Sequence, residues 1–208
     1  MYKCTNIVYH FDMIEQKDFP KQIVNIENIE ELRDILVENG VRVEDFGKSG
    51  AKKLEDLFRE LQNKETEIVK EGDKIFRKIS ALSISVKHES GGKKYVLVEE
   101  KQIFADGRER KRTPLGSLSE KLRRDEDPKV AVARALQEEL SINTNYTPSF
   151  VETINEIKES GSYPSLLTKY VFYRYNIDLE NEDYKPEGYV EHEEGTGIKT
   201  YFVWKEMQ

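Results

Sequence analysis

Two adjacent glutamates, Glu138 and Glu139, are the residues of this sequence whose types and spacing most directly suggest chemistry. They follow Arg134 by four and five residues, and Glu126 precedes the same arginine by eight. Magnesium in proteins is bound by a few carboxylate oxygens together with waters and the phosphate oxygens of a substrate. If the segment is helical, the two acids and the arginine lie within about one to one and a half turns. The pattern is therefore suited to a magnesium–phosphate site.

The segment that carries these residues, 125–143, has the pattern of a capped helix. Asp127 suits the N-cap, and Pro128 suits the first helical position. An apolar stripe follows at Val132, Leu136 and Leu140. Glu139 falls almost on this stripe, and a carboxylate that points toward a core is costly unless a cation or an arginine pairs with it. Adjacent glutamates are also common on solvated helices, so the helix alone leaves an ordinary charged surface open.

The length, charge and composition of the chain limit the kinds of protein and ligand to which this site can belong. The chain has 208 residues, enough for one domain with an appendage or for two small domains. The net charge of −7 argues against sequence-blind binding to DNA or RNA, but it allows a small phosphorylated ligand in a local basic pocket. A lone cysteine, Cys4, gives no disulfide framework. No apolar run approaches the ~20 residues of a membrane span, and the first residues lack a signal-peptide pattern, so we expect a cytoplasmic protein.

Periodicity predicts two helices, followed by strands that surround one central helix. Helical patterns occupy residues 25–40 and 50–65, and strand patterns occupy 6–11, 149–157, 166–177 and 198–206. Residues 74–104 alternate in polarity around the pair Gly91–Gly92, which predicts a β-hairpin. Residues 105–124 are interpreted as a long basic loop or a ragged strand. The change in texture predicts a helical N-terminal extension, 1–75, and a second domain, 76–208.

The spacing of the charged residues resembles the Nudix box, G-x5-E-x7-R-E-U-x-E-E-x-G-U, in which U is aliphatic. The matching positions are Glu126, Arg134, Leu136, Glu138, Glu139 and Ile142. Glu120 and Ser141 stand where the box has glycines, and Ala135 replaces the glutamate after the arginine. The resemblance covers residues 78–208. It implies an α/β protein, with a Nudix-type α/β/α sandwich around a mixed sheet, to which the small helical extension is added.

The resemblance implies hydrolysis of a nucleoside diphosphate that is linked to another group. In that family water attacks a phosphorus while Mg²⁺ or Mn²⁺ ions neutralise the bridging oxygens. By the same resemblance Glu138 and Glu139 are metal ligands, while Arg134 and Glu126 brace the segment around them. The box glutamate missing at Ala135 is a metal ligand or proton acceptor in some family members.

Another carboxylate must then replace the missing glutamate, or the chemistry is weak or absent. Glu120 is one candidate. The acidic segment 180–195 supplies three more, Glu191, Glu193 and Glu194. The sequence does not rank them, and for most acids of this segment a solvated loop tip is the simpler interpretation.

An alternating basic segment precedes the box. Arg108, Arg110 and Arg112 are spaced by two, so in an extended chain they project to one face, where guanidinium groups can bind a pyrophosphate. A charged edge strand that blocks aggregation is the alternative. One of the aromatic residues at 170–175 is a candidate for stacking on a base, although core packing explains most of them. For Trp204 core packing is the main interpretation, and lining of the pocket is the alternative.

Two functions from different classes follow. The first is a divalent-metal-dependent hydrolase of a phosphoanhydride in a nucleotide-like substrate. The alternative is a catalytically inactive Nudix-fold module that binds or senses a nucleotide, which the absent glutamate at Ala135 would explain. A scaffold without a ligand is a weaker third interpretation, because the charged box is largely kept. The N-terminal helices cap the domain, restrict the pocket or form a homodimer surface, and the sequence leaves these three roles open.

Overall fold

The computed structural model describes residues 22–111, 117–193 and 195–207. The strands are β1 (Gln22–Ile23), β2 (Glu67–Glu71), β3 (Lys74–Ser90), β4 (Lys93–Ile103), β5 (Glu109–Arg110), β6 (Leu118–Lys121), β7 (Ser149–Glu159), β8 (Leu167–Asp178), β9 (Tyr189–His192) and β10 (Lys199–Glu206). The helices are α1 (Ile29–Glu38), α2 (Leu54–Gln62) and α3 (Pro128–Leu140), with a short 3-10 helix, η1 (Val43–Asp45). The predicted strand at 6–11 lies outside the described residues.

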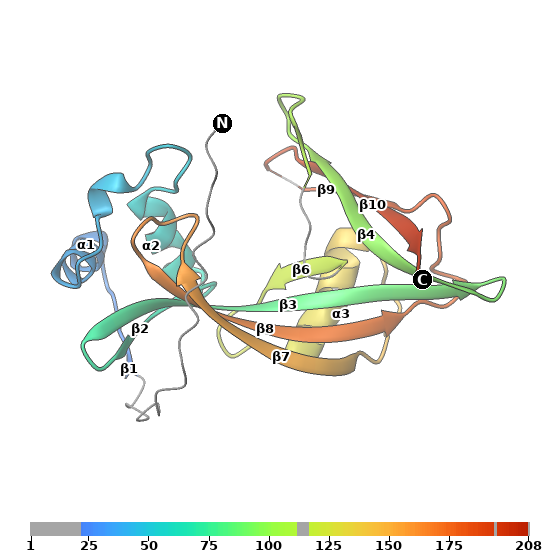
Figure 1. Ribbon diagram of the computed structural model, residues 1–208, viewed down its shortest axis with the longest axis horizontal. Coiled ribbons are helices and arrows are strands. Elements are labelled where there is room, and N and C mark those ends of the chain that lie inside the picture. Colours follow the sequence, from blue (N-terminus) through green and yellow to red (C-terminus); the bar gives the residue numbers. More distant parts are fainter. Residues whose placement is uncertain (1–21, 112–116, 194, 208) are drawn as a thin grey trace.

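One mixed sheet joins these strands, and the long strand β3 is its spine (Figure 1). Along its 17 residues β3 pairs first with β2, then with β8 and β6, and finally with β4. Strands β4, β10 and β9 continue the sheet in that order, and β7 pairs with β8. β3 and β8 run parallel, whereas the other pairs of described strands are antiparallel. The predicted α/β class with a mixed sheet is confirmed.

Helix α3 covers the face of the sheet that carries the main core. Its predicted start is confirmed, because the Asp127 carboxylate accepts a hydrogen bond of 2.8 Å from the backbone N–H of Lys129. Its predicted stripe is buried, and it packs against Leu82, Ile84, Leu97, Tyr175 and Phe202 from the strands. A second helical layer on the opposite face would complete an α/β/α sandwich. The described residues do not show one, so the sandwich stays a prediction.

Helices α1 and α2 gather at one end of the sheet, beside β1 and β2 (Figure 1). Both lie within predicted helical segments, and the Asn28 side chain caps α1 by accepting from the N–H of Glu31. Their apolar faces form a second buried cluster with Ile68, Ile75, Tyr163 and Leu166. This cluster takes residues from both sides of residue 75. The division into 1–75 and 76–208 stays a prediction, and β3 is continuous across it.

The hairpin predicted at Gly91–Gly92 is confirmed. Both glycines form the two-residue connection between β3 and β4 with positive φ angles of 59° and 75°, a conformation that glycine adopts without steric cost. The basic segment 105–124, interpreted as a long loop or a ragged strand, contains the short strands β5 and β6, so the described part of it fits the second interpretation. Within the described residues, no helix is both long enough and apolar enough to cross a membrane.

Candidate active site

Arg134, in the middle of helix α3, is the centre of a charged network. Its Nε and Nη2 atoms donate to the two carboxylate oxygens of Glu126 at 3.0 and 3.1 Å. Its Nη1 atom donates to Glu120 at 2.9 Å and to Glu138 at 3.1 Å, and Nη2 also donates to the carbonyl oxygen of Lys121 at 3.1 Å. A guanidinium group has five N–H donors, so every donor of Arg134 is used. The structure therefore brings together four of the predicted site residues, which come from β6, the following turn and α3.

The network is electrostatically well matched. Burial would lower the pKa of Arg134, but the hydrogen bonds to Glu126 and Glu120 outweigh it and raise that pKa. Burial would raise the pKa of Glu126, but Arg134 and the backbone N–H of Arg123 hold it below its ordinary value. Each charge is thus stabilised by the other in a partly buried setting. The arginine fixes the end of the turn and the carboxylate of Glu138 relative to α3.

Glu138 and Glu139 lie side by side on the last turns of α3. The side chain of Glu138 is 53% exposed, while Glu139 is half-buried, as its place beside the apolar stripe predicts. No group of three or more acidic, histidine or cysteine side chains within the described residues is arranged to hold a metal ion. Two adjacent carboxylates nevertheless fit Mg²⁺, which usually keeps several waters and takes further oxygens from a phosphate. They do not form an all-protein cage.

Ala135 is fully buried. Its exposure is 0%, and it belongs to the core cluster that includes Leu136 and Leu140. A glutamate at this position would bring a carboxylate into the apolar core. The replacement for the missing box glutamate must therefore come from another element.

Glu191 on β9 is the late acid that the structure draws toward the box. Burial raises its pKa, and the negative charges of Glu193, Glu120 and Glu99 raise it further, while a hydrogen bond from the Thr200 hydroxyl opposes the shift. Glu193 is exposed and accepts a hydrogen bond of 2.9 Å from Thr196. Glu194 lies outside the described residues. Of the two candidate acids in segment 180–195 that the structure describes, Glu191 is the one in a desolvated environment that raises its pKa.

The conformation of β9 depends on the glycine that precedes it. Gly188 has a φ angle of 84°, and a Cβ atom there would lie 2.0 Å from the carbonyl oxygen of Phe202 on β10. A side chain would therefore push β9 away from β10. Glycine at this position allows the close approach that sets Tyr189 and Glu191 on the α3 side of the sheet.

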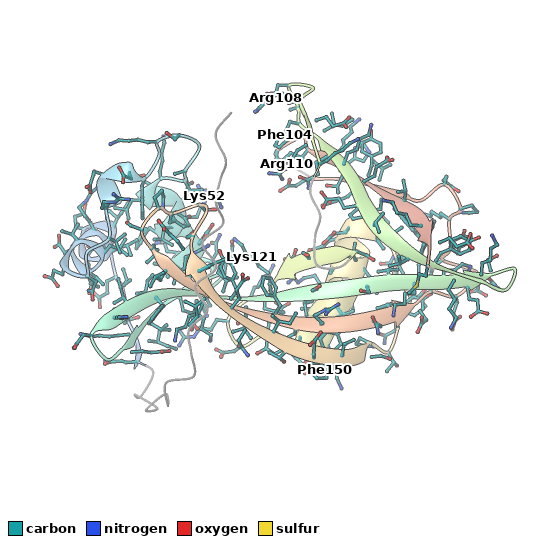
Figure 2. The ribbon with its side chains drawn as sticks, viewed as in Figure 1. Lys52, Phe104, Arg108, Arg110, Lys121 and Phe150 are labelled. Carbon is teal, nitrogen blue, oxygen red and sulfur yellow. The ribbon has the colours of Figure 1, made fainter. Side chains whose placement is uncertain are left out.

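The two arginines of the basic segment that the structure describes, Arg108 and Arg110, have different partners. Arg108 is held by Asp106, whose carboxylate accepts from Nε at 2.6 Å, whereas Arg110 donates to the side-chain oxygen of Gln102. Both guanidinium groups lie over the ring of Phe104, at 5.3 and 5.2 Å from its centroid, near the end of β4 (Figure 2). Arg112 lies outside the described residues. Arg110 is exposed, and its role in binding phosphate stays a prediction.

Three buried polar residues, Glu99, Gln102 and Thr200, complete the site and were missed from the sequence. Glu99 and Gln102 lie on β4 and Thr200 on β10, all on the same side as Phe202. They are isolated polar residues in strand patterns, and the sequence gives no signal of which strands pair. The aromatic candidates have other roles: Tyr175 is in the core, with Tyr173 and Trp204 packed against it, and Tyr170 stacks on Phe172.

No protein-family model and no curated protein matches the sequence. Among solved structures, the chain is similar to a crystal structure of an Ap4A hydrolase from C. elegans, with 18% identity and a TM-score of 0.33. A second structure, a binary complex of a C. elegans Ap4A hydrolase, is also 18% identical, with a TM-score of 0.30. Each alignment covers 62% of this chain and 80% of the other. These TM-scores are too low to transfer a fold or an activity, so the function has to be inferred from the site itself.

Proposed function

We propose that this protein is a divalent-metal-dependent hydrolase that cleaves a phosphoanhydride bond in a nucleotide-like substrate. The observation that carries the proposal is the full use of Arg134, which makes four hydrogen bonds to the carboxylates of Glu126, Glu120 and Glu138 and a fifth to the carbonyl oxygen of Lys121. A helix that only needed a solvated surface would not require a guanidinium group with every donor engaged. In this proposal Glu138 and Glu139, on the last turns of α3, supply the carboxylates for the metal, beside the acids that Arg134 holds.

Each residue has a defined part in this proposal. Glu138 and Glu139 would hold Mg²⁺ or Mn²⁺, which supplies neutralisation of charge on the phosphate oxygens. Arg110 contacts a phosphate group from the opposite side of the site. Glu191 accepts the proton of the attacking water, because its raised pKa moves it toward the range in which a carboxylate serves as a base near neutral pH. Arg134 touches no substrate and acts by holding the acids.

The alternative is a module that binds a nucleotide and metal without cleaving it. The absence of a carboxylate at position 135, where the chain has a buried alanine, favours this alternative. The half-buried Glu191 favours the hydrolase, because it is an acid in a desolvated setting that could replace the missing group. The two functions differ in turnover and share ligand binding.

The test is incubation of the purified protein with Mg²⁺ or Mn²⁺ and a panel of dinucleotides, nucleotide sugars and nucleoside triphosphates, with products followed by chromatography. We expect hydrolysis that is lost in Glu138→Gln and Glu191→Gln. Glu193→Gln is the matched control, since Glu193 lies two residues from Glu191 but is exposed and bonded to Thr196. Calorimetry with Mn²⁺ should show weaker binding in Glu138→Gln and in Glu139→Gln. Nucleotide and metal binding without any cleavage across the panel would instead establish the binding module.

A further inference from the structure

Four polar residues form one row across four neighbouring strands. Glu191 on β9 pairs in register with Thr200 on β10, Thr200 pairs with Gln102 on β4, and Gln102 pairs with Arg110 on β5. Directly paired residues of antiparallel strands project to the same face of the sheet. Gln102 and Thr200, the two inner members, are only 7% and 3% exposed. The row thus joins an exposed arginine to a half-buried acid through two buried polar side chains.

A bulge in β4 makes the row. Leu97 and Glu99 are both buried on the α3 side of β4, and strict alternation would turn Gln102 to the opposite face. The register with β10 shifts between Tyr201 and Phe202, where Lys101 and Glu99 are the successive partners and Glu100 is the additional residue. One additional residue reverses the alternation that follows it. Gln102 is therefore on the α3 side, beside Thr200.

The hydrogen bonds of the row have one direction. Arginine can only donate, so the oxygen of the Gln102 amide faces Arg110 and accepts from its Nε at 3.1 Å and also from Nη2. The Gln102 nitrogen then donates to the Thr200 hydroxyl oxygen at 3.3 Å. Thr200 is directly paired with Glu191, so its hydroxyl lies beside that carboxylate, where hydrogen bonding from Thr200 acts to lower the pKa of Glu191. A cation at one end and a carboxylate at the other polarise each bond in the same sense.

We propose that Gln102 and Thr200 are positioning residues that hold Arg110 for a phosphate group and join it, through this directed row, to Glu191. The proposal rests on the proposed function for the role of Glu191, and it adds how the phosphate contact and the proton acceptor are kept in one arrangement. Nε and Nη2 of Arg110 are bound to Gln102, so the guanidinium plane is fixed, and Nη1 of this exposed residue is left to donate to an oxyanion. The carboxylate of Glu191, at the other end of the row, strengthens the hydrogen bonds between Gln102 and Arg110 by polarising the groups between them.

The first experiment measures the affinity of the full chain for inorganic pyrophosphate, with Mg²⁺ present, by calorimetry. Arg110→Ala and Gln102→Leu should each weaken binding about tenfold, because each removes or releases the same guanidinium group. The double variant should bind no more weakly than Arg110→Ala alone. Additive losses, or a Gln102→Leu variant that folds and binds as the wild type does, would overturn the proposal. A wild type that does not bind pyrophosphate would overturn it as well.

The second experiment tests the Thr200 end with a pair of variants that keep the shape of a strand residue. Thr200→Val should weaken pyrophosphate binding severalfold, and Thr200→Ser, which keeps the hydroxyl, should restore it. Thr168→Val is the matched control, because Thr168 is equally buried but its hydroxyl makes no hydrogen bond. We expect its affinity to be unchanged. The same loss in Thr200→Val and Thr200→Ser would show that the hydroxyl does not matter.

Glu191→Gln closes the test. If Glu191 acts through the row, this variant weakens pyrophosphate binding, and its effect is absent in the Thr200→Val background. If Glu191 only repels the anion directly, the variant tightens binding in both backgrounds, which contradicts the proposal. These binding results are independent of turnover. If the protein shows the expected affinities but hydrolyses no substrate, the proposal for Gln102 and Thr200 stands and the proposed hydrolase function is refuted.

Discussion

Replacement of Arg134 by alanine is the sharpest test of how the candidate site is held together. The side chain of Arg134 is 19% exposed, and the side chain of its bidentate partner Glu126 is 15% exposed. Loss of the arginine leaves the carboxylate of Glu126 partly buried without its cation. The loss of these hydrogen bonds to a charged group lowers the free energy of unfolding by about 2–3 kcal/mol. The more exposed contacts with Glu120 and Glu138 add about 0.5–1 kcal/mol together.

The expected total loss in the free energy of unfolding is therefore about 3 kcal/mol. For a chain of this size it corresponds to a fall in melting temperature of roughly 6–12 °C. Thermal and urea unfolding would measure it, with Arg33→Ala on the exposed face of α1 as the control, for which we expect a change below about 0.5 kcal/mol. Arg134→Lys should lose most of the same stability, because an ammonium group has three donors and cannot replace the five donors of the planar guanidinium group. A melting temperature of Arg134→Ala within about 2 °C of the wild type would refute this account.

Three further predictions follow from buried or strained positions. Burial opposes ionisation of Glu60, yet Lys52 and Arg77 lower its pKa from 4.5 to about 2. The stability that the ionised Glu60 contributes is therefore complete above pH 4.5 and is lost as the pH falls toward 2. In acid unfolding, Glu60→Gln should lack this pH-dependent loss. Ala135→Glu places a carboxylate in the core and should destabilise by about 3 kcal/mol or more in urea, whereas Ala133→Glu on the exposed face should change little. Ser141 has a left-handed φ angle of 57°, which glycine adopts without the steric cost of a side chain. Ser141→Gly should therefore increase the free energy of unfolding by about 0.5–1 kcal/mol and raise the melting temperature. A lower melting temperature would contradict this reasoning.

Position 141 also shows how a local requirement persists when the residue changes. The Nudix box has a glycine there, and the chain has a serine. Ser141 still takes the left-handed conformation, and its N–H closes the last turn by donating to the carbonyl oxygen of Gln137 at 3.0 Å. The departure from the box thus changes the residue and its strain while keeping the geometry of the helix end.

The sequence by itself determined the features that depend on neighbours in the chain. The cap at Asp127 and the four-residue interval between Arg134 and Glu138 follow from the geometry of any α-helix, and both contacts are present. The two N-terminal helices and the turn at Gly91–Gly92 were predicted for the same reason, because periodicity and turn residues act locally.

Tertiary structure decided which of these residues meet others that are distant in the sequence. Glu120 reaches Arg134 because β6 pairs with β3 beneath α3, and Ala135 is buried because the sheet covers that side of the helix. The row from Arg110 to Glu191 needs three strand registers and one bulge, and one residue of slippage would turn its side chains to the other face. The hydrogen bonds of a helix join residues that are close in the sequence, whereas a strand pairs with residues that are distant in it. The row from Arg110 to Glu191 therefore forms only when the whole sheet forms.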